Sequence, residues 1–319
     1  MVLGRMTSTA VSAKQDGGLV QEDVTGWAAI DREVGGADEN KYWLGPDLQT
    51  PRHEQWLWKP RKVHGRHPHL NDVAEVVASR LAATLGLPAA ECRYAIRGAE
   101  VGVISKNVTP AGYALHDGGT FLEEVDGYKR HALAPDKEGR VRGRQNIDEG
   151  YTLEAVQQVL DGTYGPPGYE DSPGLAVFAG YLVLDALIAN TDRHPRNWAL
   201  LSRESDGRRL LAPTFDHGTA LGSGLDDSRR ATRDVSAFCR KGRARTFTPP
   251  ESLVQLAARA VSMSGATRWL DRVDALATSV IRGALEVPGG RLSEAASTFM
   301  ESVLIENQRR LRHVDRDQD

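Results

Sequence analysis

The spacing of apolar side chains in the first hundred residues predicts a small sheet and one helix. Aromatic-rich runs at 41–44 (KYWL) and 55–60 (QWLWKP) are separated by a loop of Pro, Gly and Asp, which is typical of two strands joined by a turn. Two further strands are predicted at 91–96 (ECRYAI) and 100–108 (EVGVISKNV). Between the two pairs, apolar residues recur at helical spacing, namely Val73, Val77, Leu81 and Leu85.

Two signals mark the ends of this predicted helix. Asp72 precedes Glu75 by three residues, which is the spacing of a capping box, a pair of side chains that bond to backbone N–H groups at the start of a helix. Gly86 follows the last apolar position and is placed to stop the helix. In this interpretation Glu75 has a local, structural role.

Beyond residue 150 the apolar pattern becomes helical. The stretch 152–160 is amphipathic, whereas 174–190 is apolar on nearly every face and is therefore expected at the centre of the molecule. Three more helical stretches are predicted within 251–313. Two strand-like runs, NWALL and RLLAPTF, flank the turn ESDG and predict a hairpin.

The order of these elements predicts the fold class. Strands come first and helices afterwards, which favours an α+β fold of two unequal lobes, a small β-rich N-lobe and a mainly helical C-lobe. We expect a flexible tail at 1–24, the N-lobe at 25–106 and the C-lobe at 107–319. Within 110–150, Gly, Asp, Lys and Arg dominate, and the run DKEGRVRGRQ predicts an exposed, mobile insertion.

Composition narrows the function classes only a little. The 319 residues are 40% hydrophobic and 26% charged, with a formal net charge of -3, so direct nucleic-acid binding is not indicated. Cys92 and Cys239 lie far apart with no second thiol near either, which predicts neither a disulfide framework nor a CxxC zinc site. No apolar run is long enough for a signal peptide or a membrane span, so we expect a cytoplasmic protein.

A strongly polar run, NTDRHPRNW, directly follows the most apolar predicted helix. Phosphoryl transfer needs a carboxylate near the attacking hydroxyl, hard oxygen ligands for Mg²⁺ and a cation on the nucleotide phosphates. Asp192 in this run can accept a hydroxyl proton. Asn197, five residues on, and Asp216 in LAPTFDHG can offer oxygen atoms to a metal, and the predicted hairpin would bring them to one end.

The pattern D-x-H-x-x-N, followed by an aspartate two dozen residues on, resembles the HipA-like kinases, bacterial relatives of the protein kinase fold. The resemblance covers residues 30–300, and it implies a bilobal, protein-kinase-like phosphotransferase that uses ATP and Mg²⁺. The implied reaction moves the γ-phosphoryl group to a hydroxyl, in the first place that of Ser or Thr in a protein. Asp192 is then the catalytic base, and Asn197 and Asp216 are the Mg²⁺ ligands.

The same resemblance assigns residues of the N-lobe to the nucleotide. Lys59 in WLWKP matches the strand lysine that holds the phosphates, and Glu75 matches the helix glutamate that steadies this lysine. The alternative interpretation of Lys59 is a surface charge at a strand end. Further residues expected at the nucleotide lie in the phosphate-covering loop, in the hinge and in the catalytic loop, namely Gly35, Gly36, Ser105, Lys106, Asn107 and His194.

The chain departs from the kinase pattern at two places, because it has no GxGxxG and carries DHG where many kinases have DFG. The DRHxxN run with a later D-x-G also resembles the phosphatidylinositol 3- and 4-kinases. A lipid or small-molecule kinase is therefore the alternative function, and a nucleotide-binding pseudokinase that serves as an interaction module is a third.

Three more features of the sequence have alternative interpretations. The basic run from Arg229 to Arg245 is either a solvated loop or a dock for an acidic or phosphate-bearing substrate. Asp185, inside the apolar helix, is costly unless paired and is expected to anchor the catalytic loop. The histidines of HGRHPH have no cysteine or fourth ligand nearby, which argues against a zinc site.

Overall fold

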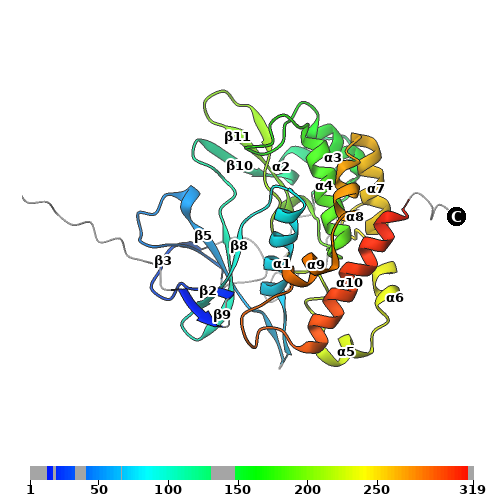
Figure 1. The fold of residues 1–319 in the computed structure, drawn as a ribbon. Coiled ribbons are helices and arrows are strands. Elements are labelled where there is room, and N and C mark those ends of the chain that lie inside the picture. Colours follow the sequence, from blue (N-terminus) through cyan, green and yellow to red (C-terminus); the bar gives the residue numbers. More distant parts are fainter. Residues whose placement is uncertain (1–12, 17–18, 33–40, 66, 131–147, 315–319) are drawn as a thin grey trace, which may run out of the picture.

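The computed structural model describes residues 13–16, 19–32, 41–65, 67–130 and 148–314. Within these ranges a β-rich lobe is followed by a mainly helical lobe, and the two lie side by side (Figure 1). The predicted α+β, bilobal fold is therefore confirmed.

A seven-stranded sheet forms the smaller lobe, in the spatial order β1-β2-β8-β9-β5-β4-β3. Neighbouring strands are antiparallel except β2 and β8, which run parallel. All four strands predicted in this lobe are present. The strands are β1 (Ala13–Asp16), β2 (Leu19–Asp23), β3 (Ala28–Arg32), β4 (Tyr42–Gly45), β5 (Trp56–Pro60), β8 (Cys92–Arg97) and β9 (Glu100–Lys106).

Strand β2 corrects the predicted tail at 1–24. Glu22 pairs with Ala95 of β8, and Val24, directly after the strand, is completely buried in an apolar cluster on the sheet. Leu19–Asp23 therefore belong to the sheet, so the tail was predicted to extend too far. A short strand that pairs with a partner 73 residues away has little signal in the local sequence, because its stability comes from that pairing.

Helix α1 (Asn71–Thr84) packs against β8 and β9, with the predicted apolar side chains buried. Gly86 ends it as predicted: its φ is +62°, and the N–H groups of Gly86 and Leu87 donate to Ala83 and Ala82 at 3.0 and 2.8 Å, the two bonds of a Schellman motif. The capping-box prediction is wrong. Leu70 occupies the N-cap without a side-chain bond, and Asp72 and Glu75 pair with cations instead.

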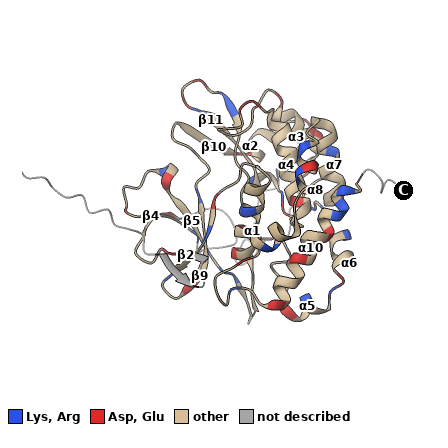
Figure 2. Cartoon of the chain, viewed as in Figure 1, with Lys and Arg blue, Asp and Glu red and all other residues tan. Residues whose placement is uncertain are grey.

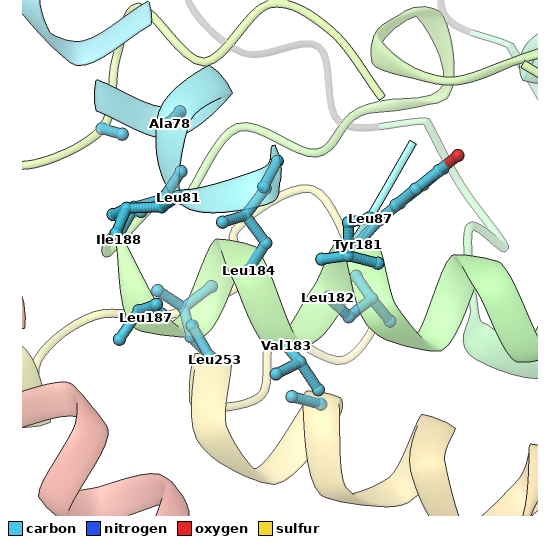
Figure 3. Packing of buried hydrophobic residues seen from close by; sticks show 14 of the residues in the cluster. Ala78, Leu81, Leu87, Tyr181, Leu182, Val183, Leu184, Leu187, Ile188 and Leu253 are labelled. Atoms are coloured by element: carbon cyan, nitrogen blue, oxygen red, sulfur yellow. The ribbon is translucent and has the colours of Figure 1, made fainter. Parts of the chain in front are cut away.

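Helix α4 (Gly174–Leu187) is the centre of the larger lobe. Figure 3 shows its side chains, Leu184 and Leu187 among them, packed between α1 and α7 (Leu253–Ser264). Four helices, not three, lie within the described part of 251–313, because Gly265 in the left-handed conformation ends α7 and residues 275–277 separate α8 (Arg268–Asp274) from α9 (Thr278–Ala284). The helices of this lobe are α2 (Gly118–Leu122), α3 (Leu153–Leu160), α4 (Gly174–Leu187), α5 (Asp227–Thr232), α6 (Val235–Arg240), α7 (Leu253–Ser264), α8 (Arg268–Asp274), α9 (Thr278–Ala284) and α10 (Glu294–Arg312).

The predicted hairpin is confirmed as β11 (Ala199–Arg203) and β12 (Arg209–Leu211), which pair antiparallel. Strand β10 (Tyr113–Asp117) extends this sheet and continues directly into α2 (Gly118–Leu122), so the stretch 110–150, rich in Gly, Asp, Lys and Arg, holds regular structure at 113–122. The run DKEGRVRGRQ lies outside the described residues. Short elements complete the fold, namely β6 (Val63–His64), β7 (His67–Pro68) and the 3₁₀ turns at Arg52–Glu54 and Pro195–Asn197.

None of the helices in the described ranges has the length and apolar character needed to cross a bilayer.

Candidate active site

Lys59 points from the sheet toward the helical lobe. It lies on β5 between Trp58 and Pro60, and alternation along the strand sends its side chain away from the face on which Trp56 and Trp58 are buried. Its ammonium lies 2.6 Å from Glu75 Oε1 on α1 and 2.8 Å from Asp216 Oδ1 of the helical lobe. The lysine therefore joins the sheet, α1 and the segment after β12.

Opposite charges stabilise the ionised forms of Lys59 and Asp216. Burial alone would lower the pKa of Lys59, but Asp216 and Glu75 raise it well above its ordinary value, so the ammonium stays charged. Lys59 in turn holds the pKa of Asp216 well below its usual range. The Asp216 side chain is 38% exposed, against 2% for Glu75, so Asp216 presents an ionised carboxylate to solvent.

Glu75 also reaches the segment after β12. Its second oxygen, Oε2, accepts a hydrogen bond from the backbone N–H of His217 at 3.0 Å. Asp216, the preceding residue, has a φ of +62°, a left-handed conformation that costs a non-glycine residue about 1–2 kcal/mol. The bond from His217 and the ion pair with Lys59 flank this strained residue and hold its carboxylate in place.

A cavity of about 770 Å³ opens between the lobes at these residues. Asp192 lines it together with Lys59, Glu75 and Asp216. Burial raises the pKa of Asp192, and the negative charge of Asp216 adds to this rise, while the neighbouring His194 opposes it. Such a volume is in the range of small-molecule sites.

The loop that carries Asp192 is anchored on a buried ion pair at the end of α4. Arg193 donates to both oxygens of Asp185, at 2.7 and 2.8 Å, and to the backbone oxygen of Asn197 at 2.5 Å. Asn190 donates to Asp185 Oδ1 at 2.8 Å. The predicted anchoring role of Asp185 is therefore confirmed, and the polar run is a loop held rigidly at the end of a packed helix.

Asn197 closes this loop. Its Nδ2 donates to the backbone oxygen of Asp192 at 2.7 Å, so the amide oxygen is the polar atom left for a ligand. His217 links the loop to Asp216, because its Nε2 lies 3.2 Å from Arg193 Nη2. Burial and Arg193 lower the pKa of His217 well below its ordinary value, so the neutral ring can accept the hydrogen bond from Arg193.

The structure brings some of the predicted site residues together and leaves others apart. Lys59, Glu75, Asp192 and Asp216 line one cavity, and Asn197 contacts Asp192 directly. Four described residues predicted at the nucleotide do not line this cavity, namely Ser105, Lys106, Asn107 and His194, and neither does the predicted metal ligand Asn197.

Polar groups of the predicted hinge residues are already hydrogen-bonded within the protein. The side chain of Asn107 donates to Arg52 O at 2.9 Å and accepts from the N–H of Thr109, and the N–H groups of Lys106 and Asn107 donate to Glu91 and Gln55. These groups are engaged in holding the turn between the lobes. His194 is more than half buried, and its Nδ1 has no hydrogen-bond partner among the described residues. Gly35 and Gly36 lie outside those residues.

Sequence reasoning missed two groups of residues at the site. Lys41 lines the cavity and lies close enough to Asp216 to help lower its pKa. It directly follows the glycine-containing run at 35–40, which was the available signal. Arg193 and His217 lie beside Asp192 and Asp216 in sequence, but their mutual contact crosses 24 residues and has no local signature.

The basic run from Arg229 to Arg245 is partly structural. The Arg230 side chain is 2% exposed and donates to Asp227 and to the backbone oxygen of Ser223, while Arg229 pairs with Asp226. Figure 2 shows acidic residues beside the basic ones at α5. A docking site for an acidic substrate at 229–245 therefore stays a prediction. Fewer basic side chains of this run are exposed than the sequence suggested. In the described part of the chain, no group of three or more His, Cys, Asp or Glu is placed to hold a metal ion.

Comparison with solved structures identifies the fold. The proinflammatory kinase CtkA of Helicobacter pylori superposes with a TM-score of 0.63 and 19% sequence identity, over 91% of this chain and 95% of CtkA. The chain has a HipA-like kinase fold. HipA of Shewanella oneidensis, in its complex with HipB and operator DNA, superposes on this kinase fold with a TM-score of 0.50 and 14% identity, over 91% of this chain and 67% of HipA. Neither protein-family models nor curated proteins give a match to the sequence.

Proposed function

We propose that this protein is an ATP- and Mg²⁺-dependent kinase that transfers the γ-phosphoryl group to a hydroxyl, with Ser or Thr of a protein as the acceptor. One observation carries the proposal: Lys59 bridges Glu75 and Asp216 at 2.6 and 2.8 Å at the wall of a cavity that Asp192 also lines. A lysine–glutamate pair, a metal-binding aspartate and a catalytic aspartate are the parts that phosphoryl transfer requires.

The residues present fit a magnesium ion. Asp216 is ionised and partly exposed, and the amide oxygen of Asn197 is a second hard donor. Mg²⁺ usually takes one or two carboxylates and completes its ligand set with phosphate oxygens and water, so a site with few protein ligands suits it. When bound, Mg²⁺ would neutralise charge on the β- and γ-phosphates.

The chain's own residues then have separable tasks. Lys59 uses two of its three N–H donors on Glu75 and Asp216, and the third, which no described residue engages, would bind a phosphate oxygen. Asp192 would accept the proton of the acceptor hydroxyl as the oxygen attacks phosphorus. A raised pKa makes its carboxylate a stronger base than an exposed aspartate. Asn197 and Arg193 hold the loop so that this carboxylate keeps its place.

Transfer of label from γ-labelled ATP to a panel of acceptors tests the proposal. We expect Mg²⁺-dependent labelling of Ser or Thr in proteins, abolished by excess EDTA. Labelling of inositol lipids or small alcohols in place of proteins would contradict the acceptor assignment and favour the lipid or small-molecule alternative. Nucleotide binding without any transfer or hydrolysis would contradict the enzyme assignment and favour a pseudokinase.

A further inference from the structure

Helix α1 carries Glu75 to Lys59, so the contacts that fix α1 also fix this ion pair. Asp72 lies one turn before Glu75 on the same side of the helix. Its side chain is completely buried and accepts from two arginines. Arg61 donates to both carboxylate oxygens at 2.9 and 2.8 Å, and Arg291 Nη1 donates to Oδ2 at 2.7 Å.

Arg291 comes from the helical lobe, from the segment between α9 and α10. Its side chain is 4% exposed and reaches three strands of the sheet. It donates to Gln21 Oε1 of β2 at 2.9 and 2.6 Å, to Ala95 O of β8 at 2.8 Å and to Gly102 O of β9 at 3.2 Å. The guanidinium carbon also lies 5.1 Å from the ring centre of Tyr94.

The other end of α1 is held by the same part of the chain. Arg272 of α8 donates to Leu85 O at 2.8 Å, and Arg80 of α1 donates to Ala284 O and Glu286 O at 3.2 and 2.5 Å. Segment 272–291 therefore contacts α1 near both ends. Near the N-terminal end the contact is a buried ion pair, and removing one partner of such a pair leaves the other charge buried without compensation.

We propose that Arg291 is a positioning residue for the Lys59–Glu75 pair. Its planar guanidinium connects Asp72 to the strands against which α1 packs. It therefore fixes the position of Glu75 relative to Lys59. This inference rests on the proposed kinase function. Lysine cannot replace this guanidinium, because a single ammonium cannot donate to Asp72, Gln21 and Ala95 in the same planar geometry.

A double-mutant cycle of Arg291→Met and Glu75→Gln tests the proposal. We expect Arg291→Met to lower kcat by about tenfold to a hundredfold, as for a small misplacement of catalytic groups, with little change in KM for ATP. In the Glu75→Gln background the same substitution should lower kcat by less than about twofold, because the pair that Arg291 positions is already lost. An unchanged kcat in Arg291→Met, or an equal loss in both backgrounds, would overturn the proposal.

The matched control is Arg282→Met in α9. This arginine pairs with Glu301, is 67% exposed and belongs to the same segment. We expect wild-type kcat from it. If Arg291→Met does not fold, Arg291→Lys replaces it, with an intermediate loss of kcat expected and wild-type kcat overturning the proposal.

Hydrogen exchange gives a readout that does not need turnover. Arg291→Met should speed amide exchange in the first turns of α1, at 74–77, more than in its last turn, at 82–84. Equal exchange in wild type and variant would overturn the positioning role. A wild-type protein that transfers no phosphoryl group would contradict the proposed function, while the exchange measurement would still decide whether Arg291 holds α1.

Discussion

At the residue scale, Asp192 is the side chain on which turnover should depend most. Its backbone oxygen already holds Asn197, and Asp192→Asn keeps that bond. We expect the variant to fold and to bind ATP with wild-type affinity, while kcat falls by about 10² to 10⁴, the usual share of a general base. Initial rates of phosphoryl transfer and calorimetry of ATP binding measure the two quantities.

The control for this substitution is Asp206→Asn on the β11–β12 turn, where the carboxylate is 50% exposed and pairs with Arg203. It should leave kcat unchanged. A wild-type rate in Asp192→Asn would remove Asp192 from the mechanism.

The two thiols should be inert in the folded protein. Burial raises the pKa of Cys92 to about 12, and likewise the pKa of Cys239 to about 12. Because the thiolate is the reactive form, almost none is present at pH 8, and an aromatic disulfide reagent should react only after unfolding. Two thiols per chain should react with the reagent in denaturant, and none should react rapidly in buffer. A fast-reacting thiol in the native protein would contradict the raised pKa values of the two side chains.

Single residues differ in how far sequence could place them. Lys59, Glu75, Asp192 and Asp216 could be nominated because each stands in a recognisable pattern, although the roles remain proposals. Glu75 also shows the limit of local patterns. Its spacing from Asp72 fits a capping box, but the ion pair with Lys59 prevails because a buried carboxylate without a charged partner costs more than a helix start without a side-chain cap. Arg291 has no local signal, since its partner Asp72 is 219 residues away.

At the scale of single elements, α4 and the loop after it act as one unit through Asp185 and Arg193. Both side chains are at most 3% exposed, so Asp185→Ala leaves the Arg193 guanidinium buried without its carboxylate. We expect the free energy of unfolding to fall by about 3–5 kcal/mol. Urea unfolding followed by circular dichroism measures the change.

The exposed pair of Arg203 and Asp206 provides the comparison, because Asp206→Ala removes a solvent-screened ion pair and should lower the free energy of unfolding far less. Equal losses for the buried and the exposed pair would contradict the anchoring role of Asp185.

The periodicity of apolar residues predicted those elements that carry a clear pattern within their own sequence. Helices α1 and α4 and the β11–β12 hairpin have clear apolar patterns and were predicted near their observed bounds. Strands β2 and β10 were not predicted, because each is short and is stabilised by a partner far along the chain, β8 and β11 respectively. The prediction for 251–313 gave three helical stretches where the structure has four, and the break between α8 and α9 contains no glycine or proline that would mark it in the sequence.

At the scale of the whole molecule, the two lobes meet through the candidate site and through α1. A ligand that binds this interface stabilises the folded chain by mass action, by about 2.7 kcal/mol at a concentration of 100 Kd. ATP with Mg²⁺ should therefore raise the Tm of the wild-type protein. We expect Asp216→Ala to lose the Mg²⁺-dependent part of this shift, which differential scanning fluorimetry with and without EDTA can separate.

The same substitution removes a partner of Lys59, so the Tm of ligand-free Asp216→Ala serves as its own baseline. A full Mg²⁺-dependent shift in this variant would contradict the assignment of Asp216 as a metal ligand.

The most direct measurement is a crystal structure with a non-hydrolysable ATP analogue and Mg²⁺. We predict a metal ion about 2.1 Å from a carboxylate oxygen of Asp216 and from the amide oxygen of Asn197, with a phosphate oxygen at Lys59 Nζ and Asp192 facing the terminal phosphate. A nucleotide bound in another cavity, or a metal ion that touches neither Asp216 nor Asn197, would contradict the account.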